Sequence, residues 1–448
     1  MENLFYLFEQ IKPIVIQALK IVVNLWWVWV PFVLWSQFKK YWLFWRNMLW
    51  LTRVFKPVVL EIKIPKEVLK PIRAMENVMQ GVHGVVYRPP DWWEKWIDGQ
   101  LQTSVSFEIV SIEGEIHFLI RFHKDYRKGI EAAIFSQYPE AEIFEVEDYA
   151  KKVPQDIPNK DWDIAASDYR LIKPNPYPIK TYTKFETEHE LLEEKVVDPI
   201  ASLLEGLAKM QPGEQFWIQI RAAPMSEPKE KWGTYYDAFL KEGEKIRDKL
   251  AKRTEKPKLK PIWQETTQIL ITGKPTEEEK EEKEIFPPEM RLTPGERDII
   301  TAVEEKISKP AFQCGVRFIY LGKRDVFFNA NLRLAFNFFN CFTTANLNAI
   351  QPWGKAFTKI HKSWFLPLNL LRPRRDYMRC RKIFRNYVNR VNHFFPRGND
   401  KIDKGIFALN VEELASLYHF PGQAVAPTPS ITRVEAKKGG PPIELPIE

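Results

Sequence analysis

The chain has 448 residues, of which 45% are hydrophobic and 28% are charged, so it is long enough to form two or three packed domains. Its three cysteines, Cys314, Cys341 and Cys380, are odd in number and isolated in the sequence, which argues against a disulfide framework or a zinc ribbon and suits a reducing cytoplasm. The formal net charge of +8 is uneven, because residues 1–56 carry +5, residues 351–404 carry +11 and the rest of the chain carries −8. Phosphate-bearing partners, either lipid or nucleic acid, are therefore expected at those two segments.

Residues 14–35 form an apolar run that predicts a transmembrane helix, with a buried core helix as the alternative. A helix of this length covers about 33 Å, enough for a hydrocarbon core of about 30 Å. Lysines and arginines follow it at once, so the positive-inside rule predicts a single-pass protein of the cytoplasmic (inner) membrane with the bulk of the chain in the cytoplasm. Residues 41–55 are predicted as an interfacial helix or as a second, re-entrant pass. The residues expected at the membrane interface are Trp26, Trp27, Trp29, Trp35, Lys39, Lys40, Trp42, Trp45 and Arg46.

After this anchor, predicted as residues 1–56, residues 57–153 alternate between strand and helix periodicities in the order β-α-β-β-α-β. This order predicts a first ferredoxin-like α+β module, with its helices on one face of an antiparallel sheet. The expected elements are a strand at 58–64, a helix at 67–82, hairpin strands at 103–112 and 115–122, a helix at 125–137 and a strand at 141–147.

A second, tandem ferredoxin-like module is predicted over residues 154–350, with a charged insertion at 225–310. Asp198-Pro199 is a favourable helix start, because Asp caps the helix and Pro suits its first turn. No fourth strand of this module is evident from the sequence. The other expected elements are one or two strands within 163–185, a strand at 215–221, a helix at 234–252, a strand at 312–321 and a helix at 329–347.

Residues 351–404 are predicted as a basic amphipathic helical segment, in which apolar residues at spacings of three and four back a positively charged face. Three interpretations stay open: a surface helix with solvated arginines, contact with anionic headgroups, and contact with DNA or RNA phosphates. The residues expected to contact phosphate or a partner are Arg374, Arg375, Arg379, Lys382 and Arg385. Residues 405–448 are predicted as a short helix followed by an extended, proline-rich tail.

Known catalytic signatures are missing from the sequence. It contains no phosphate-cradling G-x-x-x-x-G-K-[ST] loop, no G-x-S-x-G elbow and no H-E-x-x-H zinc motif. The sequence therefore predicts no catalytic residue, no cofactor and no metal site, and an enzyme of unrecognised type ranks third among the hypotheses.

Several short, spaced sequence motifs resemble the non-ATPase, membrane-proximal part of the HerA/TraG-type DNA-translocating ATPases. The first set is Phe107-Glu108-Ile109, Glu113-Gly114, Ile116-His117-Phe118, Arg127, Glu131, Gln137-Tyr138-Pro139, Glu142-Ile143 and Asp148-Tyr149. The second set is Asp198-Pro199, Leu204, Leu207, Gly213-Glu214 and Gln219-Ile220. The third set is Leu409-Asn410, Glu413-Leu414-Ala415, Leu417, His419 and Pro421, followed by Pro427, Ala436, Pro441-Pro442 and Leu445-Pro446. In longer relatives the third set runs into the P-loop motor, which this sequence, ending at Glu448, does not contain.

The resemblance implies a non-catalytic, membrane-anchored accessory subunit of a conjugation-like or type IV secretion-like translocation machine, docking a separate P-loop ATPase. It also implies that Leu409, Asn410, Glu413, Leu414, His419 and Pro421 dock this partner. DNA contact through the basic helix and assembly into homo-oligomers are further expectations. The rival hypothesis is a membrane-surface scaffold that binds anionic lipid through the basic helix and has no role in DNA translocation.

Overall fold

A computed structural model describes residues 24–65, 70–185, 198–225, 235–251, 292–360, 369–392 and 405–421, together with positions 12, 13, 17, 20 and 362. The chain divides into two compact units. The first comprises residues 1–55, 89–102 and 394–400, and the second contains the rest. The run EEEKEEKE at 277–284 and the proline-rich tail after Pro421 lie outside the described residues.

The first unit is built on α2 (Trp26–Arg53), a continuous helix of 28 residues with Pro31 inside it. The short π-helix η1 (Glu94–Asp98) packs on α2, where the Trp42 indole Nε1 donates a hydrogen bond to the Trp96 carbonyl at 2.8 Å. Gly99 ends η1 at φ 74°, and a Cβ at this position would lie 2.4 Å from the Arg46 backbone. Glycine is therefore required there by both its positive φ and the close approach of α2.

Helix α2 corrects the prediction of an N-terminal transmembrane helix. Among the helices in the described part of the chain, none combines the length and the apolar character that crossing a bilayer requires. The predicted single-pass inner-membrane location is therefore wrong. The physical reason lies in the composition of α2, which joins the end of the apolar run to residues 41–55 and so includes Lys39, Lys40, Arg46 and Arg53.

The residues predicted for a membrane interface all lie in α2. Trp26, Trp27, Trp35 and Trp45 are between 52% and 63% exposed. Lys39 and Lys40 are also exposed, whereas Trp42 and Arg46 are partly buried. Trp29 lies within the helix.

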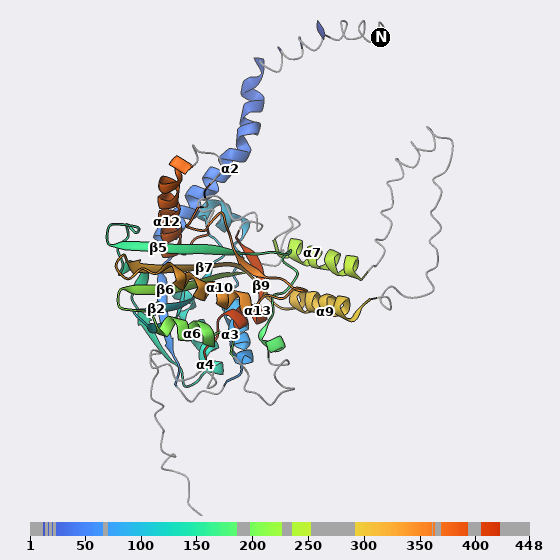
Figure 1. Ribbon diagram of the computed structural model, residues 1–448. Helices are drawn as coiled ribbons and strands as arrows, with labels where there is room; N and C mark the ends of the chain where they lie inside the picture. Colours follow the sequence, from blue (N-terminus) through green and yellow to red (C-terminus); the bar gives the residue numbers. More distant parts are fainter. Residues whose placement is uncertain are drawn as a thin grey trace, which may run out of the picture. The chain divides into compact units, whose positions relative to one another are not determined.

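The second unit contains one antiparallel sheet of nine strands among the described residues (Figure 1). The strands are β1 (Pro57–Lys63), β2 (Val105–Ile112), β3 (Glu115–His123), β4 (Glu142–Val146), β5 (Trp162–Leu171), β6 (Glu214–Pro224), β7 (Ala311–Lys323), β8 (Ile350–Pro352) and β9 (Phe407–Asn410). Their order is β4-β1-β3-β2-β6-β7-β5-β8, and β9 pairs with the first residues of β7. The predicted hairpin between β2 and β3 is confirmed, with Glu113 and Gly114 both at positive φ in its two-residue turn.

The two halves of the sheet repeat one pattern. The first half runs β1-α3-β2-β3-α4-β4 along the chain, and the second runs β5-α6-β6-β7-α10-β8. They meet where β2 pairs with β6, from Val105 opposite Ala222 to Ile112 opposite Gln215. This pairing joins the strands of the two predicted modules into one continuous sheet. The short strand β8 was not visible in the sequence.

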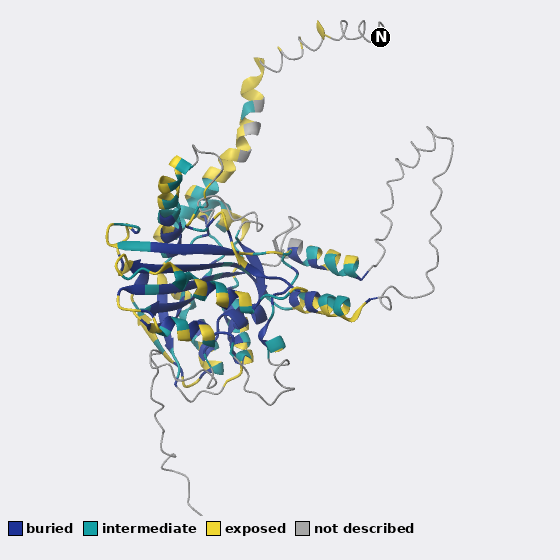
Figure 2. Ribbon diagram, in the orientation of Figure 1, coloured by how far each residue is buried: buried dark blue, intermediate teal, exposed yellow. Residues whose placement is uncertain are grey.

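Five helices cover one face of the sheet: α3 (Ile72–Val86), α4 (Arg127–Gln137), α6 (Ala201–Ala208), α10 (Leu332–Cys341) and α13 (Val411–Leu417). Alternate strand residues such as Phe107, Ile218 and Phe318 point to this side, as strand geometry requires, and pack with the helices into the main core. Figure 2 shows the strands buried between their neighbours. Short helices η2 (Lys124–Tyr126), η3 (Tyr149–Lys151) and η5 (Asn329–Asn331) complete this unit's connections.

The opposite face is covered by α12 (Arg372–Val388) and η3. A second, smaller core joins them to the sheet through residues such as Trp217, Ile319 and Leu321. At the edge beside β9, helices α7 (Tyr235–Leu250) and α9 (Pro294–Ser308) pack on each other. Helix α9 was missed within the predicted insertion, although Thr293 and Glu296 form a capping box at its start.

Candidate functional site

The outward side of α12 carries a dense cluster of positively charged side chains. We call it the basic face of α12, formed by Arg374, Arg375, Arg381, Lys382 and Arg385. Arg374, Arg375 and Arg385 are exposed, while Arg381 and Lys382 are partly buried. The Arg381 guanidinium lies over the Tyr377 ring at 5.8 Å, which holds it along the helix surface.

The single acid in α12 does not neutralise this face. Asp376 lies 3.6 Å from Arg372, one turn earlier, and also accepts a hydrogen bond from the Ile360 amide at 2.9 Å. Arg379, predicted as a contact residue, is instead turned inward and donates from Nη1 to the Phe357 carbonyl at 3.2 Å. Burial, together with the nearby Arg375 charge, lowers the pKa of Arg379. Arg379 thus helps to fasten α12, and the other four predicted contact residues lie on its basic face.

The inward side of α12 explains why the helix is fixed. Cys380, Ile383, Phe384 and Tyr387 are buried against the sheet in the smaller core. Their spacings of three and four follow the helical period, so one stripe is apolar while the remainder stays charged. Tyr377, three residues before Cys380, fits the same spacing but is 46% exposed.

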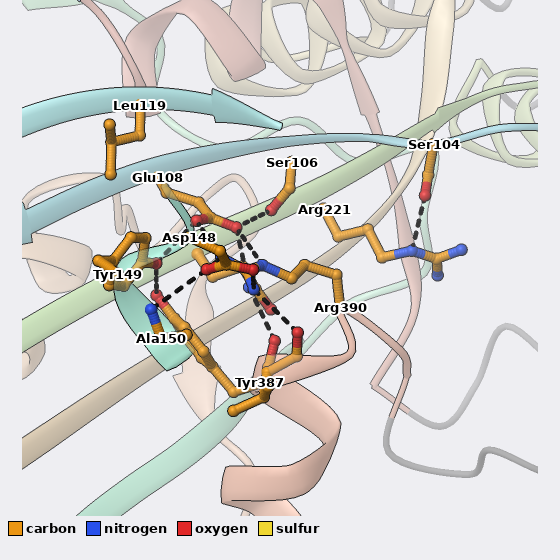
Figure 3. A network of polar contacts seen from close by, with 12 residues as sticks. Ser104, Ser106, Glu108, Leu119, Asp148, Tyr149, Ala150, Arg221, Tyr387 and Arg390 are labelled. Carbon is orange, nitrogen blue, oxygen red and sulfur yellow. Dashed lines mark hydrogen bonds and ion pairs between the residues drawn. The ribbon is translucent and has the colours of Figure 1, made fainter. Parts of the chain in front are cut away.

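A buried ionic network lies directly after the helix, around Arg390 (Figure 3). Its guanidinium donates two hydrogen bonds to Glu108 on β2, at 2.9 and 3.0 Å, and two to Asp148, at 2.7 and 2.9 Å. It also lies 5.5 Å from the Tyr149 ring centroid and 5.8 Å from that of Tyr387. Bidentate contact with two carboxylates fixes the guanidinium in both position and orientation.

Glu108 is the centre of this network and has no exposed surface. Burial alone would raise its pKa, but the Arg390 charge and hydrogen bonds outweigh burial and lower the pKa to about 2. Its oxygens also accept hydrogen bonds from Ser106 at 2.6 Å, Tyr149 at 2.7 Å and Gln219 at 3.1 Å. A carboxylate with this many donors remains ionised and ties β2, η3 and the end of α12 together.

Arg390 adopts an unusual backbone conformation for a non-glycine residue, with φ 51°. It occupies the left-handed position that closes a Schellman motif, because its amide donates to the Tyr387 carbonyl and the Val391 amide donates to the Asn386 carbonyl. Glycine normally fills this position. Arginine is accommodated because the reversal of the chain aims the guanidinium at Glu108 and Asp148.

The residues predicted to dock a partner lie in the core of this chain. Leu409, Asn410, Glu413, Leu414 and His419 are all at most 2% exposed, and Pro421 is partly buried. Asn410 and Glu413 form the capping box that starts α13. Within this fold, strand β9 and helix α13 use these side chains to close the core.

Two buried ion pairs hold this C-terminal segment. Lys306 on α9 lies 3.1 Å from Glu413, and His419 Nε2 lies 2.8 Å from Asp198. Burial alone would lower the pKa of His419, but the Asp198 charge and hydrogen bonds raise it. The third set of motif residues therefore contacts the second set, through the ion pair between His419 and Asp198.

The polar network was not predicted from the sequence. Arg390 lies in the basic segment 351–404 but was not singled out there, and Glu108 and Asp148-Tyr149 entered only as motifs of the resemblance. One sequence signal could have indicated the network. Glu108 is an acidic residue between two apolar residues, Phe107 and Ile109, in a predicted strand. Such an acid faces the side opposite its neighbours and needs a partner there.

Residues 52–346 match the protein family described as Domain of unknown function (DUF8128). The match covers about two thirds of the chain and runs from the end of α2 to just after α10, so it includes both halves of the sheet up to β7. No curated protein matches the sequence. Because the match extends over more than half of its length, the chain belongs to the Domain of unknown function (DUF8128) family.

Proposed function

We propose that this protein is a non-catalytic binding subunit whose basic face of α12 contacts the phosphates of a nucleic acid. The observation that carries the proposal is the exposure of Arg374, Arg375 and Arg385 on one rigid helix whose only acid is already engaged. Arginine suits this role because its planar guanidinium forms paired hydrogen bonds with phosphate oxygens.

The attachment of α12 supports the proposal further. The helix is held by its apolar stripe along one side and by the Arg390 network at its end, so its cations are presented at fixed spacing. Fixed cations lose little conformational freedom on binding, which favours affinity. Contacts to phosphate alone carry no base information, so we expect binding with little sequence preference.

The partner that we propose is a separate P-loop ATPase, as the resemblance to the HerA/TraG-type translocating ATPases implies. The sequence motifs shared with that family support this partner. Several residues of these motifs contact one another in the fold: Glu108 with Tyr149, Arg127 with Glu131, and Asp198 with His419. Co-purification of the tagged chain with a P-loop ATPase tests this partner. Repeated recovery of the chain without any such ATPase would count against it.

Nucleic-acid binding is tested by fluorescence anisotropy with short single- and double-stranded DNA and RNA. Three phosphate contacts would make the affinity fall about 40-fold between about 50 and 200 mM salt. Double reversal of Arg374 and Arg375 to Glu should abolish binding at the lower salt. Lys124→Glu with Lys128→Glu, exposed positions at η2 and α4, makes the same charge change elsewhere and should bind nearly as the parent does.

Two outcomes would overturn the proposal. One is absence of DNA and RNA binding at low salt, and the other is equal weakening by the two double variants. Vesicles with and without anionic lipid form a parallel arm, and binding to anionic vesicles without binding to nucleic acid would favour the rival lipid-binding function.

A further inference from the structure

Three arginines project from neighbouring strands on the same side of the sheet as the Arg390 network. Arg121 on β3 and Arg221 on β6 both lie opposite Ser106 of β2, and Arg317 on β7 follows in the next row. Residues that flank Arg221, Ile220 and Ala222, are fully buried on the helix-covered side. Arg221 therefore points to the opposite side, with Arg121 roughly 10 Å away across β2.

The neighbours of Arg221 differ from those of the other arginines. Arg390 has Glu108 and Asp148, and Arg317 has Asp168. Arg221 donates from Nε to the Ser104 hydroxyl at 3.0 Å, and no carboxylate of the described residues pairs with it. Figure 3 shows its guanidinium turned away from the carboxylates of the network and toward Ser104.

The electrostatics of this position favour an anion. Partial burial and the nearby charges of Arg317 and Arg121 lower the pKa of Arg221 to about 10. Burial and the Arg390 charge lower the pKa of Arg121 to about 10 as well, against the opposing attraction of Glu108 and Asp148. Two guanidiniums of one sign facing the same space repel each other, and a bound anion would relieve this repulsion.

We propose that Arg221, with Ser104 and Arg121 beside it, forms a binding site for a phosphate-class oxyanion. The two terminal nitrogens of Arg221 make no hydrogen bond within the described residues and present a fork that matches two phosphate oxygens. The Ser104 hydroxyl accepts from Arg221 Nε and keeps its own proton to donate to a third oxygen. This site uses β3, β6 and the residue before β2, so it does not rest on the proposed function of α12.

The oxyanion has two sources, free inorganic phosphate or the phosphoryl group of a mononucleotide. Each probe is titrated into the full-length protein, and thermal unfolding is followed against chloride at matched ionic strength. A saturable rise in Tm is expected, because a ligand that binds only the folded state stabilises it. The probe with the lower Kd identifies the source.

Arg221→Gln should weaken binding of the effective probe at least about tenfold, and Ser104→Ala should weaken it by a smaller factor. Lys128→Gln, an exposed substitution on α4, is the control and should leave the Kd unchanged. Ser104→Ala keeps the test decisive if Arg221→Gln does not fold. Absence of stabilisation by either probe, or an unchanged Kd in the variants that fold, would overturn the proposal.

Discussion

The basic face of α12 and the Arg390 network lie next to each other in the sequence, yet the same side chain has opposite roles in them. Arg385 is exposed and has no carboxylate partner among the described residues, whereas Arg390, five residues later, is 4% exposed and held by two carboxylates. A buried charge must be paired, because its desolvation costs several kcal/mol. An exposed arginine carries no such requirement and remains available to a ligand.

This contrast predicts that removing Arg390 has a severe effect on stability. Arg390→Ala removes the charged partner of the buried Glu108, so the free energy of unfolding should fall by about 3–5 kcal/mol. Urea unfolding followed by far-UV circular dichroism measures this loss. Arg385→Ala is the matched control and should change stability by less than about 0.5 kcal/mol. Similar losses in the two variants would refute the contrast.

The backbone at Arg390 allows a finer comparison. Arg390→Gly removes the same ion pairs but suits the left-handed conformation of this position, so it should be less destabilising than Arg390→Ala by about 1 kcal/mol. The same urea titration resolves the difference. Equal stability of the two variants would show that the positive φ at this position has no energetic weight.

Lowering the pH should weaken the ionic network around Arg390. The pKa of Glu108 is lowered from 4.5 to about 2 in the folded state, so its contribution is fully present above pH 4.5 and is lost as the pH falls toward 2. This shift corresponds to about 3 kcal/mol. Unfolding free energies of the parent and of Glu108→Gln, measured between pH 6 and 2.5, should show a steeper decline for the parent. Glu140→Gln removes an exposed carboxylate and should follow the parent curve.

A smaller loss is expected from the Tyr149 hydroxyl, which donates to Glu108 and contacts the Tyr387 hydroxyl at 2.6 Å. Tyr149→Phe should lower the free energy of unfolding by about 2 kcal/mol, because a hydrogen bond to a buried charge is lost. Tyr377→Phe, on the exposed side of α12, provides the control and should be nearly neutral. A neutral Tyr149→Phe would mean that Arg390 alone satisfies Glu108.

The weakest effect on stability is predicted for the basic face itself. Reversal of Arg374 and Arg375 to Glu should change the free energy of unfolding by less than about 0.5 kcal/mol, since these side chains are exposed and make no ion pair within the described residues. Thermal and urea unfolding of the same preparation used for anisotropy measure it. Unfolding of this variant would invalidate the binding comparison and show that the face has a structural role.

Short-range patterns predicted much of the second unit. The alternation along residues 58–64 and 103–122 corresponds to β1, β2 and β3, and the Glu113-Gly114 turn lies where it was expected. The period of 3.6 likewise located α7, α10 and α12, although α10 ends at Cys341 rather than continuing to residue 347. These predictions succeeded because the apolar pattern of each element is contained within about a dozen neighbouring residues.

Two features of the second unit could not be read from the sequence because they depend on distant partners. Strand β8 has three residues, which are too few for a periodic pattern. It forms because it pairs with the edge of β5. Leu409 and Glu413, which the resemblance implies dock a partner, are buried by contacts with β7 and Lys306. The N-terminal apolar run was taken for a membrane span, whereas the described helix α2 continues through four basic residues.

Periodicity and turn chemistry within the sequence therefore sufficed for most helices and strands of the second unit and for the charge of α12, since those depend on neighbouring residues. The joining of two repeated halves through β2 and β6, and the choice of which arginine is buried, required the folded chain. Charge and hydropathy indicate whether a side chain requires a charged partner or an apolar environment. Only packing of the folded chain brings Glu108 to Arg390, which are 282 positions apart in the sequence.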